Sequence, residues 1–328
     1  MFEDYRLVYP LTYLVIINWN GREILRKCLT TLFDNTKSKN ARVVLVDNAS
    51  IDGSIEMLQE DFPQVQLIKN ETNMGFSIAN NQGIRIALAN GAIQVLLLNN
   101  DIEITDVKWL ETLTAVLESD QKIGVVGCKL LYPNGKIQHA GGVIKLRGAY
   151  NRGEREQDTG RYDKVQFVDY VTGAALLIRA KVIREIGLLD EGFTPIYWED
   201  TDWCVRARLY GYKIAYTPKP TLIHHCGIDT AKFGSSKTFI FREGAIRFFL
   251  LNFQTKDIIK RIIKFETKAA IACLIRRNPN GHLPIALRSD ASTRLLLFVK
   301  AWLPSIRDLK GIIALRRQRF KLGEKLPL

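Results

Sequence analysis

The sequence predicts an α/β fold in which helices flank a mostly parallel sheet. Over roughly the first hundred residues, short apolar runs alternate four times with segments of helical periodicity. This alternation is typical of βαβ units, whose strands pair in parallel and whose crossovers are right-handed. The runs are apolar throughout rather than alternately polar, which indicates that both faces of the sheet are covered.

The N-terminal elements follow from these patterns. The apolar run at 13–18 predicts the first strand, and Trp19, Asn20 and Gly21 predict a turn before a helix with one apolar face. The polar, glycine-containing stretch 70–81 predicts a connection. We expect strands at 13–18, 42–46, 66–69 and from 95, and helices at 22–33, 54–61 and 83–89.

The following part of the chain is interpreted in the same way. Residues 132–136 predict a hairpin turn between a strand at 123–131 and a returning strand from 137. Residues 147–164 carry glycine and both charge signs, and we expect a mobile loop there, a candidate lid. Further helices are expected at 109–118, at 181–186 and from about 199 to Gly211, and further strands at 173–178, 212–217 and 222–225.

The chemistry is expected where the strand at 95–98 leaves the sheet. Asn99, Asn100 and Asp101 follow this strand directly. Ligands of open α/β sheets bind outside the carboxyl ends of the strands. A carboxylate there can hold a hard divalent cation, and the cation can neutralise a diphosphate. Taken alone, the same residues also suit a simple turn.

The usual phosphate-binding signatures are absent from the sequence. No Gly-x-Gly-x-x-Gly follows the first strand, and no Gly-x-x-x-x-Gly-Lys-Ser/Thr loop occurs. Asp47, at the end of the second strand, is a candidate acceptor of a hydrogen bond from a nucleobase or ribose. The alternative is that Asp47 only caps the following turn.

A second polar cluster lies where a helix is expected to begin. Glu199, Asp200 and Asp202 follow Trp198 within four positions. Acidic residues in a first turn interact favourably with the helix dipole, but three of them exceed what capping needs. At least one is therefore a candidate general base, whose pKa nearby apolar rings would raise.

Histidine and cysteine are scarce. His224 and His225 are adjacent at a strand end in a chain of four histidines, which makes them candidates for a metal or phosphate contact. The five cysteines are scattered without zinc-ligand spacing, so reduced thiols and a cytoplasmic location are expected. No signal-peptide pattern opens the sequence, and no apolar run has the length of a spanning helix.

The net charge of +13 is unevenly distributed. Residues 237–328 hold 20 Lys and Arg against 6 Asp and Glu, whereas residues 1–236 are nearly neutral. We therefore expect a catalytic domain at 1–236 and a basic helical region at 237–328. Its segments 239–253, 258–277 and 293–320 are amphipathic, which favours peripheral binding to an anionic membrane surface. The alternative is a helical appendage packed on the body with a solvated basic face.

The order of these clusters resembles that of family 2 glycosyltransferases, which have the GT-A fold, a Rossmann-like sheet flanked by helices. The most similar members are rhamnosyltransferase-like enzymes of bacterial cell-surface polysaccharide synthesis. Each matching segment is weak alone, but seven in order are a strong signal. They are residues 15–21, 44–54, 73–81, 98–101, 187–193 and 199–206, together with His224.

The resemblance implies roles for the matched positions. Asp200 corresponds to the general base, and Asp47 would contact the nucleobase. Asn73, Gly75 and Asn81 would line the nucleotide and ribose side. The other candidate residues for binding nucleotide or substrate are Asn18, Asn99, Asn100, Trp198, Glu199 and Asp202.

The resemblance also implies a site for Mg²⁺ or Mn²⁺. Asp101 corresponds to the last acid of the family's Asp-x-Asp motif, and Asn99 stands where the motif has its first acid. Asp101 is then the main carboxylate ligand. His224 corresponds to a histidine that can complete the site, and His225 is the alternative.

The implied reaction is an inverting sugar transfer. The donor would be a UDP- or dTDP-sugar, including dTDP-rhamnose, and the acceptor a hydroxyl of a glycan or lipid-linked molecule at the inner face of the cell membrane. The main alternative, a nucleotidyltransferase, predicts an early glycine-rich basic loop, which is absent. Nucleic-acid binding is not expected, because the charge lies in amphipathic helices without a nucleic-acid motif.

Overall fold

The computed structural model describes residues 10–226, 236–268 and 299–322. The strands are β1 (Thr12–Asn18), β2 (Ala41–Asp47), β3 (Gln66–Lys69), β4 (Gln94–Asn99), β5 (Ile102–Glu103), β6 (Ile123–Leu131), β7 (Ile137–His139), β8 (Gly142–Lys145), β9 (Gly148–Asn151), β10 (Gln166–Phe167), β11 (Ala175–Arg179) and β12 (Lys213–His224). The helices are α1 (Arg22–Asn35), α2 (Ser54–Asp61), α3 (Gly75–Ala89), α4 (Trp109–Glu118), α5 (Ala180–Ile186), α6 (Glu199–Leu209), α8 (Ser236–Asn252), α9 (Thr255–Arg261), α12 (Leu303–Arg307) and α13 (Leu309–Leu322).

The N-terminal half of the central sheet is parallel. Strands β3, β2, β1 and β4 lie side by side in that order and run in the same direction. The order in which the strands are added reverses at β1, because the chain crosses back after β3 and forms β4 on the other side of β1. Ligands of such sheets bind at the carboxyl ends of the strands where this reversal occurs, and β1 and β4 end there at Asn18 and Asn99.

The rest of the sheet is mixed. Strand β11 lies antiparallel between β4 and β6, whereas β12 pairs with β6 in parallel and with the short β5 in antiparallel orientation. The pairing of β12 with β5 matters for the site, because it sets His224 opposite Ile102, next to Asp101. The predicted α/β fold with a mostly parallel central sheet is confirmed.

Helices cover both faces of the sheet and form two buried apolar layers. One layer holds the buried sides of α1, α2 and α4, with Leu29, Met57 and Trp109 fully buried. The other holds α3, α5, α6 and α8, with Trp203 and Phe248 among its members. This two-sided cover explains why the strand sequences are apolar throughout.

Several predicted boundaries are wrong. Helix α3 begins at Gly75 and not at 83, because its polar residues are buried and hydrogen-bonded; Asn80, for example, donates to the Phe76 carbonyl. The predicted loop at 147–164 contains strand β9, which pairs with β8. The two strands predicted at 212–217 and 222–225 form one strand, β12, with an irregularity between Thr217 and Thr221.

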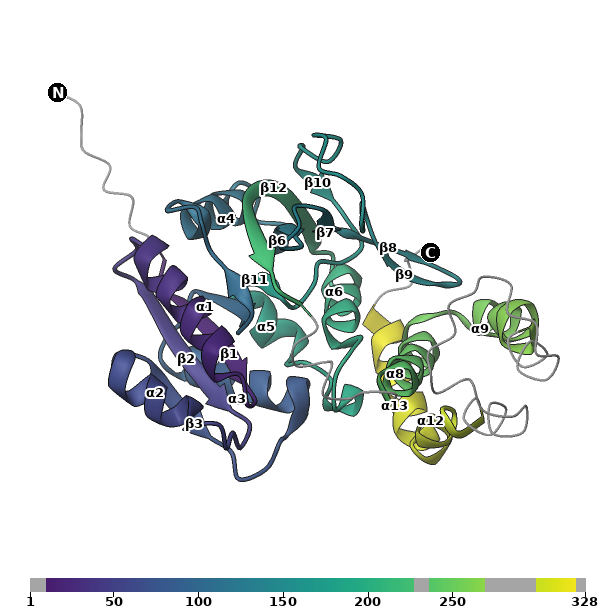
Figure 1. Cartoon of the computed structure of the whole chain (residues 1–328). Coiled ribbons are helices and arrows are strands. Elements are labelled where there is room, and N and C mark those ends of the chain that lie inside the picture. The colour runs from purple at the N-terminus through teal and green to yellow at the C-terminus, as the bar shows by residue number, and fades with distance from the viewer. Residues whose placement is uncertain (1–9, 227–235, 269–298, 323–328) are drawn as a thin grey trace.

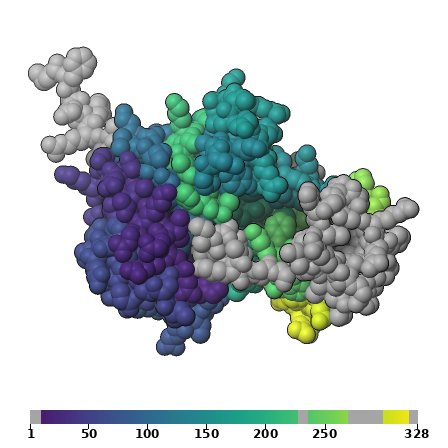
Figure 2. Space-filling model, viewed as in Figure 1, coloured from purple at the N-terminus to yellow at the C-terminus, as the bar shows by residue number. Residues whose placement is uncertain are grey.

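The C-terminal helices pack against the body through α8. Ala245, Phe248, Phe249 and Phe253 belong to the same buried apolar cluster as residues of α3, α5 and α6. Figures 1 and 2 show α8, α9, α12 and α13 at the opposite end of the molecule from the N-terminal strands, with the middle of the chain between them. The predicted division at residue 236 therefore separates segments that share one core.

Two of the helical segments predicted in this region differ from the structure or extend beyond the described residues. The helix predicted at 293–320 is divided at Asp308, between α12 and α13, and its residues 293–298 lie outside the described part of the chain. The helix predicted at 258–277 is described as far as 268. Within residues 10–226, 236–268 and 299–322, the helices are too short or too polar to cross a membrane.

Candidate active site

A cavity of about 700 Å³ opens at the carboxyl ends of β1 and β4. Its floor contains Asn99, Asn100 and Asp101, which follow β4. The start of α6 brings Glu199 and Asp200 to the same cavity, and the end of β12 brings His224. Residues that are far apart in the sequence thus meet at the sheet edge where ligands of α/β folds bind.

Asp101 and His224 form a pair at this edge. The His224 Nε2 atom lies 3.0 Å from Asp101 Oδ1, and both side chains are about nine-tenths buried. The other ring nitrogen, Nδ1, lies 2.7 Å from Gln138 Oε1 and donates its hydrogen to that oxygen. In the neutral ring Nε2 would then be the acceptor, and the Asn99 amide nitrogen lies 3.4 Å from it.

This pair fits a divalent cation. In the part of the chain that the structure describes, Asp101 Oδ1 is buried without a hydrogen-bond partner, and His224 Nε2 lies 3.0 Å from it. With a neutral imidazole that carries its hydrogen on Nδ1, both atoms would be free to bind one cation. Neighbouring ligands of an octahedral ion with bonds of about 2.1 Å are about 3.0 Å apart, which matches their separation. Among the described residues no group of three His, Cys, Asp or Glu gathers for a metal, so a ligand would supply the other donors.

His225 has different partners. Its Nε2 atom lies 2.8 Å from Glu103 Oε2, and the same oxygen is 2.8 Å from Lys27 Nζ. Because successive side chains of an extended chain point to opposite sides, only one of the two histidines can face Asp101. In the structure that residue is His224.

Asp200 sits at the N-terminus of α6 with its carboxylate turned into the cavity. Its Oδ2 atom accepts a hydrogen bond from the Gly173 N–H at 2.7 Å, and its Oδ1 atom accepts one from the Thr201 N–H. Burial raises the pKa of Asp200 above its ordinary value, although these hydrogen bonds oppose the change. A carboxylate with a raised pKa is a stronger base when ionised.

Glu199 differs from its neighbour. It is 4% exposed, and its Oε2 atom is buried without a hydrogen-bond partner among the residues that the structure describes. Burial, and then the nearby charge of Asp200, hold the pKa of Glu199 well above its usual range. The surroundings therefore raise the pKa of Glu199 further than that of Asp200, and carboxyl groups with perturbed pKa values are common at catalytic sites.

Trp198 precedes both carboxyl groups and is held in a left-handed backbone conformation with φ of 78°. Its ring packs 5.0 Å from that of Phe248, centroid to centroid, and its Nε1–H donates to the Phe241 carbonyl. A bulky residue adopts such a conformation only where the surroundings enforce it. The tryptophan thereby fixes the turn that leads into α6.

The polar residues after β1 and β2 bond mainly to one another. Asp47 is fully buried, and its two oxygens accept from the Asn18 amide at 3.1 Å and from the Ser50 N–H at 2.8 Å. Asn100 donates to Asn18 Oδ1 at 2.9 Å. Of these residues, Asn100 reaches the cavity lining. The others hold the ends of the two strands together.

The segment that precedes and opens α3 supports the site from outside the cavity. Asn81 donates to the Leu189 carbonyl and accepts from the Leu189 N–H, each at 3.0 Å. Gly75 has φ of +76°, and a Cβ there would lie 2.8 Å from the Pro195 carbonyl oxygen. Asn73 accepts from the Gly75 N–H. Asn73, Gly75 and Asn81 therefore position the 189–195 loop and do not line the cavity.

Asp202 also lies away from the cavity. Its carboxylate is fully buried and is paired with Arg206 of its own helix and with Arg319 of α13. Residues 200 and 202 are two positions apart, and two residues of a helix point about 200° apart around its axis. One therefore faces the cavity and the other faces the C-terminal helices.

Sequence reasoning missed Gln138. This residue fixes the ring of His224 from β7, 86 positions earlier in the chain. It also missed an aromatic wall formed by Trp19, Tyr150, Tyr170 and Phe241. No local sequence pattern distinguishes these residues, because the tertiary packing of the elements that carry them brings them to the cavity.

A comparison with family models identifies the chain. The model described as Glycosyl transferase family 2 matches residues 13–187, more than half of the sequence. The chain belongs to glycosyl transferase family 2.

Curated relatives match about two thirds of the chain. The O-antigen biosynthesis protein RfbC of Myxococcus xanthus is 28% identical over 234 residues, which are 68% of this chain and 18% of that protein. The dTDP-rhamnosyl transferase RfbF of Shigella flexneri is 25% identical over 221 residues, 67% of this chain and 71% of that protein. The match also spans only 24% of y4gI of Sinorhizobium fredii, so two of these family relatives are much longer.

Solved structures of glycosyltransferases share the fold. The crystal structure of GalNAc-T7 with UDP, GalNAc and Mn²⁺ aligns with a TM-score of 0.63 at 16% identity and covers 94% of this chain and 58% of that chain. At this identity the likeness establishes the fold alone. The family 2 chain therefore has the GT-A fold, as the sequence predicted.

Proposed function

We propose that this family 2 protein is an inverting glycosyltransferase that uses a nucleotide-sugar donor and a divalent metal. One observation carries the proposal: Asp200 and the pair of Asp101 and His224 line a single cavity at the carboxyl ends of the parallel strands. A sugar transfer from a nucleotide needs both groups, a base for the acceptor hydroxyl and positive charge beside the diphosphate.

Asp200 acts as the base. An acceptor hydroxyl is a weak nucleophile, so Asp200 takes its proton while the oxygen attacks the anomeric carbon. The bond from that carbon to the diphosphate oxygen breaks in the same step, and a single displacement inverts the configuration. The Gly173 N–H holds one Asp200 oxygen, so the carboxylate keeps one orientation during the transfer.

Asp101 and His224 are the residues that would hold the metal. When bound, Mg²⁺ or Mn²⁺ supplies positive charge to the departing nucleoside diphosphate. Gln138 accepts the Nδ1–H of His224 and thereby keeps Nε2 available as a ligand. GalNAc-T7, whose solved structure contains UDP and Mn²⁺, supports this assignment through the shared fold.

The donor is proposed to be a UDP- or dTDP-sugar. RfbF, a dTDP-rhamnosyl transferase, supports dTDP-rhamnose as the first donor to test. Asp47 and Asn18 hold the strand ends on the side where the resemblance puts the nucleobase. For Asp47 to meet the base directly, it would exchange a present hydrogen bond for one to the ligand.

The acceptor is proposed to be a glycan or a lipid-linked sugar at the inner face of the cell membrane. RfbC, an O-antigen biosynthesis protein, supports a cell-surface polysaccharide as the product. Ile259, Ile263 and Ile306 of the C-terminal helices are each more than half exposed, at 52%, 65% and 57%. Exposed isoleucines among basic residues suit the surface of an anionic membrane.

The proposal is tested by the variant Asp200→Asn. Without the base, transfer should fall by about 10²- to 10⁴-fold, whereas nucleotide binding should change little. Turnover is measured with radiolabelled donor, binding by calorimetry with UDP and dTDP, and product configuration by NMR. Asp34→Asn, an exposed acid on α1, is the matched control. Unchanged turnover in Asp200→Asn would remove Asp200 as the base.

A further inference from the structure

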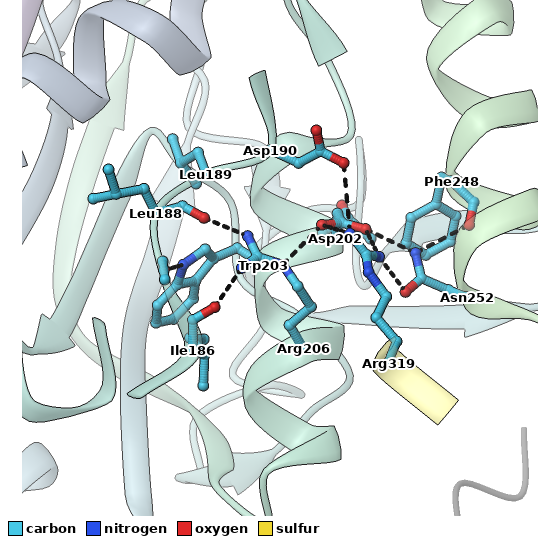
Figure 3. Close-up of polar contacts among 12 residues, drawn as sticks. Ile186, Leu188, Leu189, Asp190, Asp202, Trp203, Arg206, Phe248, Asn252 and Arg319 are labelled. Atoms are coloured by element: carbon cyan, nitrogen blue, oxygen red, sulfur yellow. Dashed lines mark hydrogen bonds and ion pairs between the residues drawn. The ribbon is translucent and has the colours of Figure 1, made fainter. Parts of the chain in front are cut away.

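The last described helix sends a charged side chain into the body of the protein. Arg319 of α13 is buried, with 7% of its surface exposed. Figure 3 shows its guanidinium group meeting the Asp202 carboxylate between α6 and α8. Arg319 belongs to the basic segment 293–320, for which membrane binding was predicted, but its burial excludes contact with a membrane.

Asp202 is bound from three elements at once. Arg319 contacts both of its oxygens, through Nη1 to Oδ1 and through Nη2 to Oδ2, the latter at 3.2 Å. Arg206 Nε donates to Oδ2 at 3.1 Å, and the Asn252 amide of α8 donates to Oδ1 at 2.8 Å. Arg319 also donates to Asn252 Oδ1 at 2.8 Å. A buried carboxylate with a two-pronged arginine partner has one fixed orientation.

The same cluster holds the loop before α6. Arg206 donates to the carbonyls of Ile186 and Leu188 at 2.9 and 2.7 Å. Arg319 Nη2 lies 3.5 Å from Asp190, which also pairs with Arg247 of α8 at 3.1 Å. The loop from Asp190 runs on through residues 194–198 to the cavity wall. The chain is therefore tied to the C-terminal helices on both sides of the cavity-lining segment 196–201, at Asp190 before it and at Asp202 after it.

The cluster of polar contacts around Asp202 is close in sequence to the turn that carries Asp200. Asp202 is two residues from Asp200, and its own N–H donates to the Trp198 carbonyl at 2.8 Å. The residues that line the cavity do not include any from α13. Helix α13 therefore affects the reacting groups indirectly, and the contact of Arg319 with Asp202 is its link to the first turn of α6.

We propose that Arg319 is a positioning residue, which sets the orientation of the Asp200 carboxylate by clamping Asp202. This inference rests on the proposed role of Asp200 as base. Without Arg319, Asp202 keeps only its contacts with Arg206 and Asn252. Its carboxylate can then rotate toward either residue, and the first turn of α6 is held less firmly. A shift of about 1 Å in a reacting group can cost about 100-fold in rate.

Arg316 provides a matched control on the same helix. It lies one turn before Arg319, and it too binds the body, by donating to the Leu250 carbonyl at 2.8 Å. Its guanidinium also packs 4.5 Å from the centre of the Phe320 ring. It does not contact Asp202. Arg316→Met therefore weakens the docking of α13 without releasing the clamp.

The test compares Arg319→Met with Arg316→Met in the full chain. We expect Arg319→Met to lower kcat by about 10- to 100-fold. The affinity for nucleotide should stay within about twofold, because the donor site is untouched, and Arg316→Met should keep most of its kcat. Equal losses of kcat in the two variants would overturn the proposal, because they would show that α13 serves only to stabilise the fold.

Hydrogen exchange gives a readout that needs no substrate. The amides of residues 199–204 should exchange faster in Arg319→Met than in Arg316→Met, and unchanged exchange would overturn the clamp. If the wild-type protein transfers no sugar, the proposed function fails, but faster exchange would still establish that Arg319 stabilises the first turn of α6.

Should Arg319→Met not fold, Arg319→Lys replaces it. A single ammonium group should give a kcat and an exchange rate between those of the wild type and those expected for Arg319→Met. Wild-type values of both would contradict the two-pronged clamp.

Discussion

Glu199 and Asp200 show how the surroundings of adjacent residues separate their chemistry. Asp200 has backbone N–H donors on both oxygens, whereas one oxygen of Glu199 is buried without a partner. The side chain that keeps its donors can stay ionised and act as a base. The other carboxyl favours the protonated form and can donate a hydrogen bond to a ligand.

The raised pKa of Glu199 predicts how stability depends on pH. Because the folded-state pKa lies above the unfolded value of about 4.3, the folded state binds more protons than the unfolded chain, and the free energy of unfolding falls as pH rises through this range. Glu199→Gln removes the buried charge. It should therefore stabilise the protein at pH 8, by on the order of 1–3 kcal/mol, and less at pH 5. Urea unfolding at both pH values measures this difference, and a destabilised variant at pH 8 would contradict it.

At the residue scale, the sequence indicated which acids to consider but not where each one points. Asp200 and Asp202 belong to one acidic cluster, yet one lines the cavity and the other pairs with arginines. Which of the two acids lines the cavity depends on what each face of α6 packs against. Arg319 lies 117 positions from Asp202, so no local pattern predicts their contact.

At the scale of elements, α3 lies directly on the sheet because of one small residue. A Cβ at Gly83 would lie 2.3 Å from a methyl carbon of Val15 in β1. The glycine thus allows the helix to approach the strand that ends at Asn18. Its cost in helix propensity, about 1 kcal/mol relative to alanine, is outweighed by this packing.

Gly83→Ala should therefore destabilise the protein, although alanine is the better helix former. We expect a loss of about 1–3 kcal/mol, because the added methyl group has to displace Val15 or lift the helix. Gly148→Ala is the control, because its Cβ would meet no atom within 3.6 Å. Both are measured by urea unfolding. A stabilised Gly83→Ala variant would show that the helix can shift without penalty.

The strands and the amphipathic helices were predictable because their apolar periodicity is local. The ranges Ser54–Asp61, Gln66–Lys69, Trp109–Glu118 and Ile123–Leu131 agree with the prediction to the residue. The start of α3 was missed because its buried polar residues resemble a loop in sequence. Asn81, for example, bonds to the Leu189 backbone, which lies more than 100 positions away.

At the scale of the whole molecule, part of the charge of the C-terminal region is used within the protein. Arg247 and Arg319 are buried in ion pairs with the body, so they are not available to a membrane. The exposed isoleucines of α9, of α12 and of the π-helix at Ile262–Glu266 remain as the candidate membrane-contacting surface. Deleting the region from 237 is a poor test, because Phe248 and Phe253 belong to the core.

A double substitution, Ile263→Glu with Ile306→Glu, tests membrane contact without disturbing the core. Binding to vesicles that contain phosphatidylserine should fall by about 10-fold or more, because two apolar side chains are lost and two negative charges are added. Val165→Glu, an equally exposed apolar position on the body, should leave binding unchanged. Vesicle flotation measures both, and full binding by the double variant would exclude this surface as the anchor.

The measurement that tests the account most directly is thermal unfolding with UDP- and dTDP-sugars, with and without Mn²⁺. A ligand that binds only the folded state raises its melting temperature. We predict that one nucleotide class raises the melting temperature by several degrees and that this rise needs Mn²⁺. The rise should be lost in His224→Ala and kept in His225→Ala. No rise with any nucleotide sugar, together with a rise for a nucleoside triphosphate, would contradict the account and favour a nucleotidyltransferase.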